Sequence, residues 1–194
     1  MLKEENQLSS EYSILIAQLR VPIGEKEYSL SSISPVLTSS DRSERKAGAE
    51  ALYGALEDQQ TKLDQLYHDL VQVRHKMALE LGYENYVELG YKKLQRTDYN
   101  DKDVAIYRDA IHEYVVPVVQ KLKARQKKRL GVDNLKFYDV PFKFNSGNAT
   151  PKGGAEWIIE NGKKMYQELS PETDEFFNFM LSNGLTDLEA KDGK

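Results

Sequence analysis

Hydrophobic residues recur at helical spacing along most of this chain. The most regular stretch follows Ser39-Ser40-Asp41, whose side chains can accept hydrogen bonds from the free amides of a new helix. Apolar residues then alternate at steps of four and three, with a polar interruption at Gln59: Leu52, Leu56, Leu63, Leu66, Leu70, Val73 and Met77. This seam predicts one helix of about 40 residues that ends at Gly82, and it needs a partner because one helix cannot bury its own stripe.

Shorter helical patterns flank this seam. Residues 8–19 carry apolar side chains at helical spacing without a well-formed cap before them, so we expect this helix to begin upstream of Met1 and the amino end to be cut. A short helix is expected over 85–91, stopping near Gly90. Both patterns indicate a helical protein.

A second long helix is predicted after Asp98 or Asn100, either of which can cap it. Its apolar stripe continues to Gly131. Pro117 lies inside this pattern, where proline removes one backbone hydrogen bond and clashes with the preceding turn. We therefore predict a kink near 114–116, or a helix that restarts there.

The remaining segments are less regular. Residues 20–30 alternate apolar and polar positions around a glycine-containing turn, which predicts a short β-hairpin. Residues 132–153 form the least regular part, with 137–142 expected to be extended, and are the candidate for an internal break. Two helices follow, the second capped by Ser170 with Pro171 at its first position. The predicted fold class is mainly α, with long antiparallel helices in one partial domain over 1–194.

Composition narrows the function classes. The 194 residues include 40% hydrophobic and 30% charged residues, and no apolar run reaches the ~20 residues that would span a bilayer. The absence of cysteine excludes disulfides, thiol catalysis and thiolate metal sites. A net charge of −4 argues against a nucleic-acid footprint. We expect a soluble, cytoplasmic protein that binds neither nucleic acid nor membrane.

The three histidines do not form a zinc motif. A zinc peptidase helix needs two histidines one turn apart with a glutamate beside the first. His112-Glu113 supplies the opening pair, but the fifth position is Val116. His68 and His75 are seven residues apart, roughly 10 Å along a helix, which is too far for one ion. We therefore interpret all three as structural and expect no metal ligand.

Other candidate groups have simpler interpretations. The carboxylate pairs Glu80/Glu84 and Glu172/Glu175 are ordinary on a surface with 31 acids, and Gly153-Gly154 is more typical of a turn than of a phosphate loop. Several tyrosines could face a peptide but more often pack at helix ends: Tyr83, Tyr86, Tyr91, Tyr99 and Tyr138. A basic run could bind an acidic partner, although positive charge also suits the end of a helix: Lys121, Lys123, Arg125, Lys127, Lys128 and Arg129. No acid/base pair or catalytic residue is predicted.

Several collinear motifs nevertheless carry a family resemblance. They are the segment 79–99, which ends in Arg96-Thr97-Asp98-Tyr99, then Tyr138-Asp139-Val140-Pro141, and Leu169-Ser170-Pro171-Glu172-Thr173. With the long helix from Ser40, they resemble the oligoendopeptidase F branch of the thimet-type zinc metallopeptidases. The resemblance runs from about Leu8 to Lys194 and covers an internal part of such an enzyme.

This resemblance implies a cytoplasmic zinc endopeptidase whose helices surround a deep channel that admits oligopeptides. In the family, the His-Glu-x-x-His helix and the other catalytic side chains lie downstream of the matched segment, beyond a stretch like 187–194. The resemblance therefore implies an inactive channel scaffold whose packing partner is the missing catalytic segment, with zinc only in the intact enzyme. The alternative is a stand-alone, non-catalytic helical interaction module.

Overall fold

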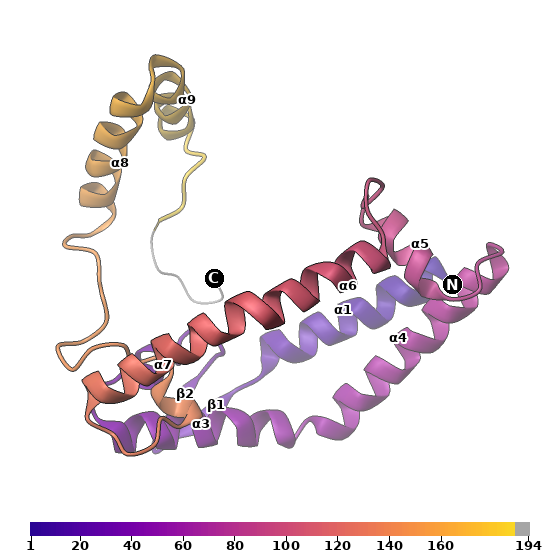
Figure 1. Ribbon diagram of the computed structural model, residues 1–194, viewed down its shortest axis with the longest axis horizontal. Coiled ribbons are helices and arrows are strands. Elements are labelled where there is room, and N and C mark those ends of the chain that lie inside the picture. The colour runs from indigo at the N-terminus through magenta and orange to yellow at the C-terminus, as the bar shows by residue number, and fades with distance from the viewer. Residues whose placement is uncertain (189–194) are drawn as a thin grey trace. The chain divides into compact units, whose positions relative to one another are not determined.

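The computed structural model describes residues 1–188, which form two compact units (Figure 1). The first unit is Met1–Gly147, and the second begins at Asn148. Most of the stretch 187–194, at which the family resemblance ends, lies outside the described residues. The prediction that 1–194 forms one partial domain with a break at 132–153 stays a prediction.

The first unit is built from helices and one hairpin. In chain order its elements are α1 (Leu2–Gln18), β1 (Val21–Ile23), β2 (Lys26–Tyr28), α2 (Ser34–Leu37), α3 (Arg42–Glu57), α4 (Gln60–Glu80), α5 (Tyr86–Lys93), α6 (Asp101–Ala110), the π-helical η1 (Ile111–Val115), α7 (Val116–Leu130) and the 3₁₀ turn η2 (Phe137–Asp139). The two strands pair antiparallel, with Val21 opposite Tyr28. The mainly α fold and the hairpin near residues 20–30 are thus confirmed.

The predicted 40-residue helix is wrong, because the chain forms two helices there. Asp41 caps α3 by accepting the Ser43 amide at 2.8 Å. The helix then ends at Glu57, and α4 begins at Gln60. Gln59 has ψ near 2° and donates its amide to Leu56 O at 3.0 Å, a tighter 3₁₀-type bond that breaks the α-helical ladder. The break falls where Gln59 interrupts the apolar seam.

Two hydrophobic cores hold this unit together. One joins the hairpin to α2 and α3 through buried Leu19, Val21, Ile33, Val36 and Ala55. The other joins α4 to α5 through Val73, Met77, Ala78 and Leu89, with Leu8 of α1 packed against it. Gly82, at φ 81°, lies just past the end of α4 in the left-handed region, where glycine costs little. The apolar seam is therefore divided between two separate cores.

The helix from α6 to α7 restarts where Pro117 predicted. Asn100, one of the two predicted caps, accepts the amides of Lys102 and Asp103. The π-helical η1 precedes Pro117, and α7 begins at Val116. Of the residues described, α6 and η1 bury none, and α7 buries only Gln126. Most of this long helix therefore lies open to solvent.

Two local predictions are wrong. Residues 137–142 are not extended, because Asp139 accepts the Lys136 amide through its carboxylate and folds the chain into η2. α5 does not stop near Gly90 but continues to Lys93. The first difference thus arises from a side-chain hydrogen bond to the backbone that favours a turn over an extended segment.

The second unit contains α8 (Ala155–Leu169) and α9 (Pro171–Ser182). Ser170 caps α9 as predicted, accepting the Thr173 amide at 3.2 Å. The helices pack together through stacked rings of Tyr166 and Phe177, whose centroids are 4.4 Å apart. Within the part of this unit that the structure describes, neither helix has a buried residue.

Candidate functional site

The most highly organised polar cluster surrounds Asp139, whose side chain is fully buried. Arg42 binds both carboxylate oxygens, with Nε 2.9 Å from Oδ1 and Nη2 2.8 Å from Oδ2. Arg45, also buried, places Nη2 3.1 Å from Oδ1, and the Lys136 amide donates to Oδ2 at 2.9 Å. The carboxylate thus joins α3 to η2 through charge-assisted hydrogen bonds.

Gln126 holds the same segment against α7. Its buried amide nitrogen lies 2.6 Å from Phe142 O and 3.2 Å from the carbonyl oxygens of Asp139 and Val140. Phe142 is buried beside Arg45, whose guanidinium carbon lies 4.3 Å from the ring centroid. Arg45 Nε is buried and has no hydrogen-bond partner in the described part of the chain. The face of the Phe142 ring, which carries negative potential, lies against this guanidinium and attracts its positive charge.

The electrostatics of this cluster favour anchoring over proton transfer. The hydrogen bond from Arg42 lowers the pKa of Asp139 to about 2, helped by the Lys136 amide and Arg45 and opposed by burial. A carboxylate with this pKa stays charged at neutral pH, where a general acid or base must exchange protons. The cluster therefore fixes 139–142 between α3 and α7.

A second buried carboxylate, Glu5, joins three helices. Arg74 of α4 donates to Oε1 at 2.8 Å, and Lys93 of α5 donates to Oε2 at 2.6 Å. Burial raises the pKa of Glu5, but the hydrogen bonds from Lys93 and Arg74 outweigh it and leave the pKa lowered. Glu5 is thus an ionised link from α1 to α4 and α5.

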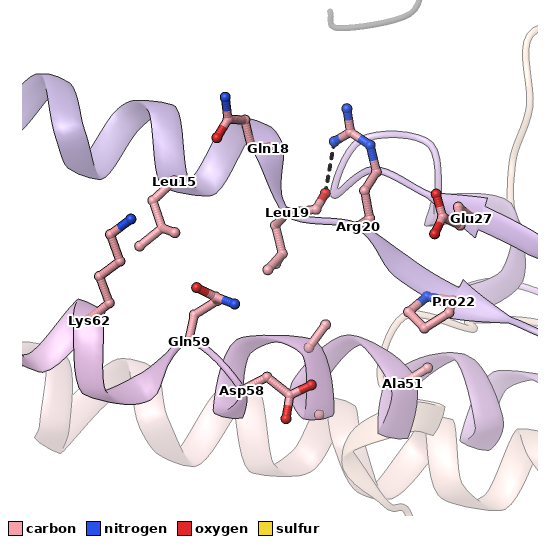
Figure 2. A pocket seen from close by; sticks show the side chains of 12 residues that line it. Leu15, Gln18, Leu19, Arg20, Pro22, Glu27, Ala51, Asp58, Gln59 and Lys62 are labelled. Carbon is pink, nitrogen blue, oxygen red and sulfur yellow. Dashed lines mark hydrogen bonds between the residues drawn. The ribbon is translucent and has the colours of Figure 1, made fainter.

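A groove of about 680 Å³ opens between the end of α1, the hairpin and the junction of α3 with α4 (Figure 2). Its charged lining residues are Arg20, Glu27, Asp58 and Lys62. Arg20 is engaged at the end of α1, where its guanidinium donates to the carbonyl oxygens of Ala17 and Leu19. The lining contains mixed charges and amides but no nucleophile paired with a base, so it resembles a binding groove more than a catalytic centre.

The structure does not bring the candidate metal ligands together. His68 and His75 are exposed on α4, and His112 is exposed in η1. Within residues 1–188, no group of three or more His, Asp or Glu side chains could hold a metal ion. The described residues therefore do not fit the zinc ion that the family resemblance implies.

The other predicted candidates lie on surfaces or in packing contacts. Glu80, Glu84, Glu172 and Glu175 are all exposed. A Cβ at Gly153 would lie 2.5 Å from Trp157 Cβ, so glycine there permits close packing at the start of α8. The tyrosines pack against neighbouring side chains: Tyr83 with Lys92, Tyr86 with Lys93, Tyr91 with Tyr99, and Tyr138 with Arg42.

Sequence reasoning missed the anchoring roles of Asp139 and Glu5. The motif Tyr138-Asp139-Val140-Pro141 contains the acid, but the arginine partners of Asp139 lie 94 and 97 residues away in the sequence. The position of this acid between an aromatic and an aliphatic residue is the sequence signal that indicates a buried carboxylate. Glu5 offered none, because Glu4 beside it is exposed and chemically alike.

A sequence comparison places this arrangement in a known class of hydrolase. The family model described as peptidase family M3 matches residues 36–150, more than half of the chain. The chain therefore belongs to peptidase family M3. No curated protein matches it.

Solved structures narrow the likeness to oligoendopeptidase F. A protein assigned as an oligoendopeptidase F is 47% identical over 100% of this chain, with a TM-score of 0.92. Another assigned so, from Bacillus anthracis, is 52% identical over 98% with a TM-score of 0.87. A PZ peptidase A solved with an inhibitor is 48% identical over 98% with a TM-score of 0.91. The chain spans 34%, 35% and 34% of these proteins, about a third of their length.

No described helix is both long enough and apolar enough to cross a membrane.

Proposed function

We propose that this chain is the channel scaffold of an oligoendopeptidase F-like zinc metalloendopeptidase that hydrolyses peptide bonds in oligopeptides. In this proposal the 194-residue chain is inactive alone, and a further segment of the intact enzyme supplies the zinc site. We also propose that the enzyme acts in the cytoplasm. The observation that carries the proposal is the likeness to oligoendopeptidase F structures at 47–52% identity over nearly the whole chain.

The partial coverage of these relatives supports a scaffold role. The matched region is about a third of each relative, so most of a comparable enzyme would lie outside it. The organised polar clusters around Asp139 and Glu5 connect helices and hold no reacting group. Their arrangement supports a role in holding helices around a site formed elsewhere.

The exposed apolar surface of α8 and α9 supports a missing packing partner. Five large side chains there are substantially exposed: Trp157, Met165, Leu169, Phe176 and Phe179. A concentration of exposed apolar side chains on two adjacent helices is typical of an interface. The proposed partner is the catalytic segment of the intact enzyme.

Zinc belongs to the proposal through the family, whose members are zinc-dependent in general. Such a metal would polarise a peptide carbonyl and acidify a water. The described residues do not fit the ion, so no step of hydrolysis is assigned to this chain.

The proposal can be tested on the purified 194-residue chain. We expect less than one zinc per chain by elemental analysis and no cleavage of a quenched fluorescent oligopeptide, with or without added zinc. An intact family enzyme serves as the positive control for the assay. Zinc-dependent cleavage by the chain would contradict the claim that it is inactive.

The coding DNA provides an independent test. We expect an in-frame His-Glu-x-x-His beyond the codon for Lys194. A reading frame without this motif would overturn the enzyme proposal for this locus. It would favour the alternative, a non-catalytic helical interaction module, which the exposed α6–η1–α7 helix also supports.

A further inference from the structure

The second unit contains two Asn-Gly pairs, Asn161-Gly162 and Asn183-Gly184. Asparagine is one of the thermolabile residues of proteins. Before glycine it is most exposed to attack by the next backbone nitrogen, because glycine has no Cβ to hinder the approach. Each asparagine donates its side-chain amide to the carbonyl oxygen four residues earlier, at 2.7 Å for Asn161 and 2.8 Å for Asn183. The two pairs therefore differ mainly in their backbone surroundings.

The first pair lies inside α8 and is explained by packing. Both of its residues are half-buried within the helix. A Cβ at Gly162 would lie 3.0 Å from Phe177 Cζ, so glycine lets α8 approach α9 closely there. The Gly162 nitrogen is held in the hydrogen-bond ladder of the helix interior. It can attack the Asn161 side chain only if the middle of α8 opens.

The second pair lies at the C-terminal end of α9. Asn183 directly follows the last helical residue, and Gly184 comes next at φ 64°. Both residues are exposed, and a Cβ at Gly184 would meet no atom of the described chain within 4 Å. The left-handed backbone explains glycine at 184, since glycine is the usual residue just past a helix end. No neighbouring group therefore restrains this pair except the helix end itself.

Two backbone hydrogen bonds close this helix end. Gly184 N donates to Leu181 O at 3.2 Å, and Leu185 N donates to Met180 O at 2.9 Å. Together they form the Schellman motif, which satisfies the last carbonyl groups of a helix. Helix ends fray, and they open at a much lower free energy than helix interiors. The Gly184 nitrogen is therefore released far more often than the Gly162 nitrogen.

We propose that Asn183 is a modification site, at which the chain deamidates without an enzyme and forms isoaspartate. When the helix end opens, Gly184 N loses its proton to hydroxide and bonds to Asn183 Cγ. The bond from Cγ to Nδ2 breaks, and Nδ2 takes up a proton and leaves as ammonia. Water then opens the cyclic imide. Cleavage of the new bond to Cγ gives aspartate, whereas cleavage of the bond to the main-chain carbonyl carbon gives isoaspartate, whose main chain runs through Cγ.

Both products weaken the end of α9. The new carboxylate places negative charge where the helix dipole is already negative, and it removes the donor that Asn183 directs at Phe179 O. In isoaspartate the main chain also gains a methylene, which moves Gly184 and Leu185 away from the carbonyl groups that they cap. The last turn of α9 therefore frays after modification. Peptidase activity takes no part in this chemistry, so the inference is independent of the proposed function.

The first test is peptide mapping of the 194-residue chain after incubation at mildly alkaline pH. Trypsin places the two asparagines on separate peptides, 153–163 and 165–191. We expect the mass change from amide to acid to appear at least roughly tenfold faster in 165–191, because the helix end opens more easily. Fragment ions should place it at Asn183 and not at Asn178. Equal rates in the two peptides, or modification at Asn178, would overturn the proposal.

Unfolding in guanidinium chloride separates the fold from the local sequence. Both pairs then lie in open chain with glycine after asparagine, so the two rates should become similar. This outcome would show that α8 protects Asn161 in the folded chain. A difference that persists unchanged in denaturant would mean that neighbouring residues select Asn183, and it would overturn the structural argument.

Glycine substitutions identify the attacking group. Gly184→Ala adds a Cβ beside the attacking nitrogen and should slow modification of Asn183, even in denaturant, where the left-handed backbone no longer matters. Gly162→Ala is the matched control and should leave the rate at Asn183 in denaturant unchanged. An isoaspartate methyltransferase should label peptide 165–191 of the modified chain. Aspartate without isoaspartate, or no effect of Gly184→Ala, would contradict the route through the cyclic imide.

Hydrogen exchange measures the consequence for α9. The modified chain should exchange faster than the fresh chain at 180–185, while exchange in α3 stays the same. Asn183→Asp carries the charge without the added methylene, so its increase should be smaller than that of the chain containing isoaspartate. Unchanged exchange at 180–185 after modification would contradict the proposed fraying of the helix end.

Discussion

The first unit and the second unit use helices of similar length in different ways. In the first unit, α3 and α4 contribute buried side chains to two cores. The buried carboxylates of Asp139 and Glu5 each form ion pairs with two basic side chains. In the described part of the second, α8 and α9 have a stacked ring pair but no buried residue. Amphipathic spacing alone therefore does not show whether a helix face is covered.

The two units differ in which interactions stabilise their folded state. A buried carboxylate is costly unless its partners are fixed, and removing one partner leaves a charge in an apolar setting. The first unit contains such groups, so it should respond strongly to single substitutions. The second unit should respond weakly, because its side chains are still partly hydrated.

The largest effect is expected at Asp139. Asp139→Asn removes the charge that compensates buried Arg45, and we expect about 3–5 kcal/mol less free energy of unfolding in urea. Asp133→Asn, exposed on the same segment, should change it by less than about 0.5 kcal/mol. Equal effects of the two substitutions would contradict the claim that buried, paired carboxylates stabilise the first unit.

Acid should weaken the first unit through the same group. The pKa of Asp139 is lowered from 3.8 to about 2 in the folded chain, so its contribution is complete above pH 4 and is lost as the pH falls from 3.8 towards 2. The loss should be roughly 2 kcal/mol. Glu5, whose pKa is also lowered, acts in the same direction.

Urea unfolding between pH 6 and pH 2.5 measures this loss. Asp139→Asn should lose less stability over that interval than the unchanged chain. Parallel pH curves for the two would show that Asp139 is not the titrating group.

A matched pair of glycines on α3 tests the packing of the first core. A Cβ at Gly48 would lie 2.6 Å from Val36 Cγ1, so Gly48→Ala should destabilise by about 1–3 kcal/mol. A Cβ at Gly54 meets nothing within 4 Å, and Gly54→Ala should stabilise the helix by up to about 1 kcal/mol. Thermal unfolding of both variants should give shifts of opposite sign, and shifts of the same sign would argue against close packing of α2 on α3.

The smallest effect is expected in the second unit. Phe177→Leu removes the ring stacked on Tyr166 and should cost about 0.5–1.5 kcal/mol of local stability, seen as faster hydrogen exchange in α8 and α9. Phe176→Leu is the control, because that neighbouring ring is 61% exposed. Faster exchange in α3 or α4 of the Phe177 variant would mean that the two units do not respond separately.

The sequence predicted the helix boundaries that are set by single residues. Ser170, Asn100 and Pro117 set helix boundaries through their own hydrogen bonds or ring geometry, so their positions could be found without tertiary structure. Gln59 interrupts the apolar seam at the break between α3 and α4, but the apolar spacing continues across it and therefore predicts one helix instead of two.

The anchoring sites depend on long-range contacts instead. Asp139 becomes buried only because Arg42 and Arg45, which lie on α3, reach it in the folded chain. The apolar stripe of α6 and α7 can likewise be found from spacing, but its exposure to solvent cannot, since that depends on which elements pack against these helices. Sequence spacing thus supplied candidates, and burial decided among them.

Because α3 ends before Asp58 and α4 begins after Gln59, the direction in which the apolar face of α4 points is not tied to that of α3. In a continuous helix, one inserted residue would turn everything beyond it by about 100°. Val73 and Met77 would then leave their core together. At this junction the two irregular residues can absorb an inserted residue, so length variation among relatives can occur there while each helix keeps its own face inward.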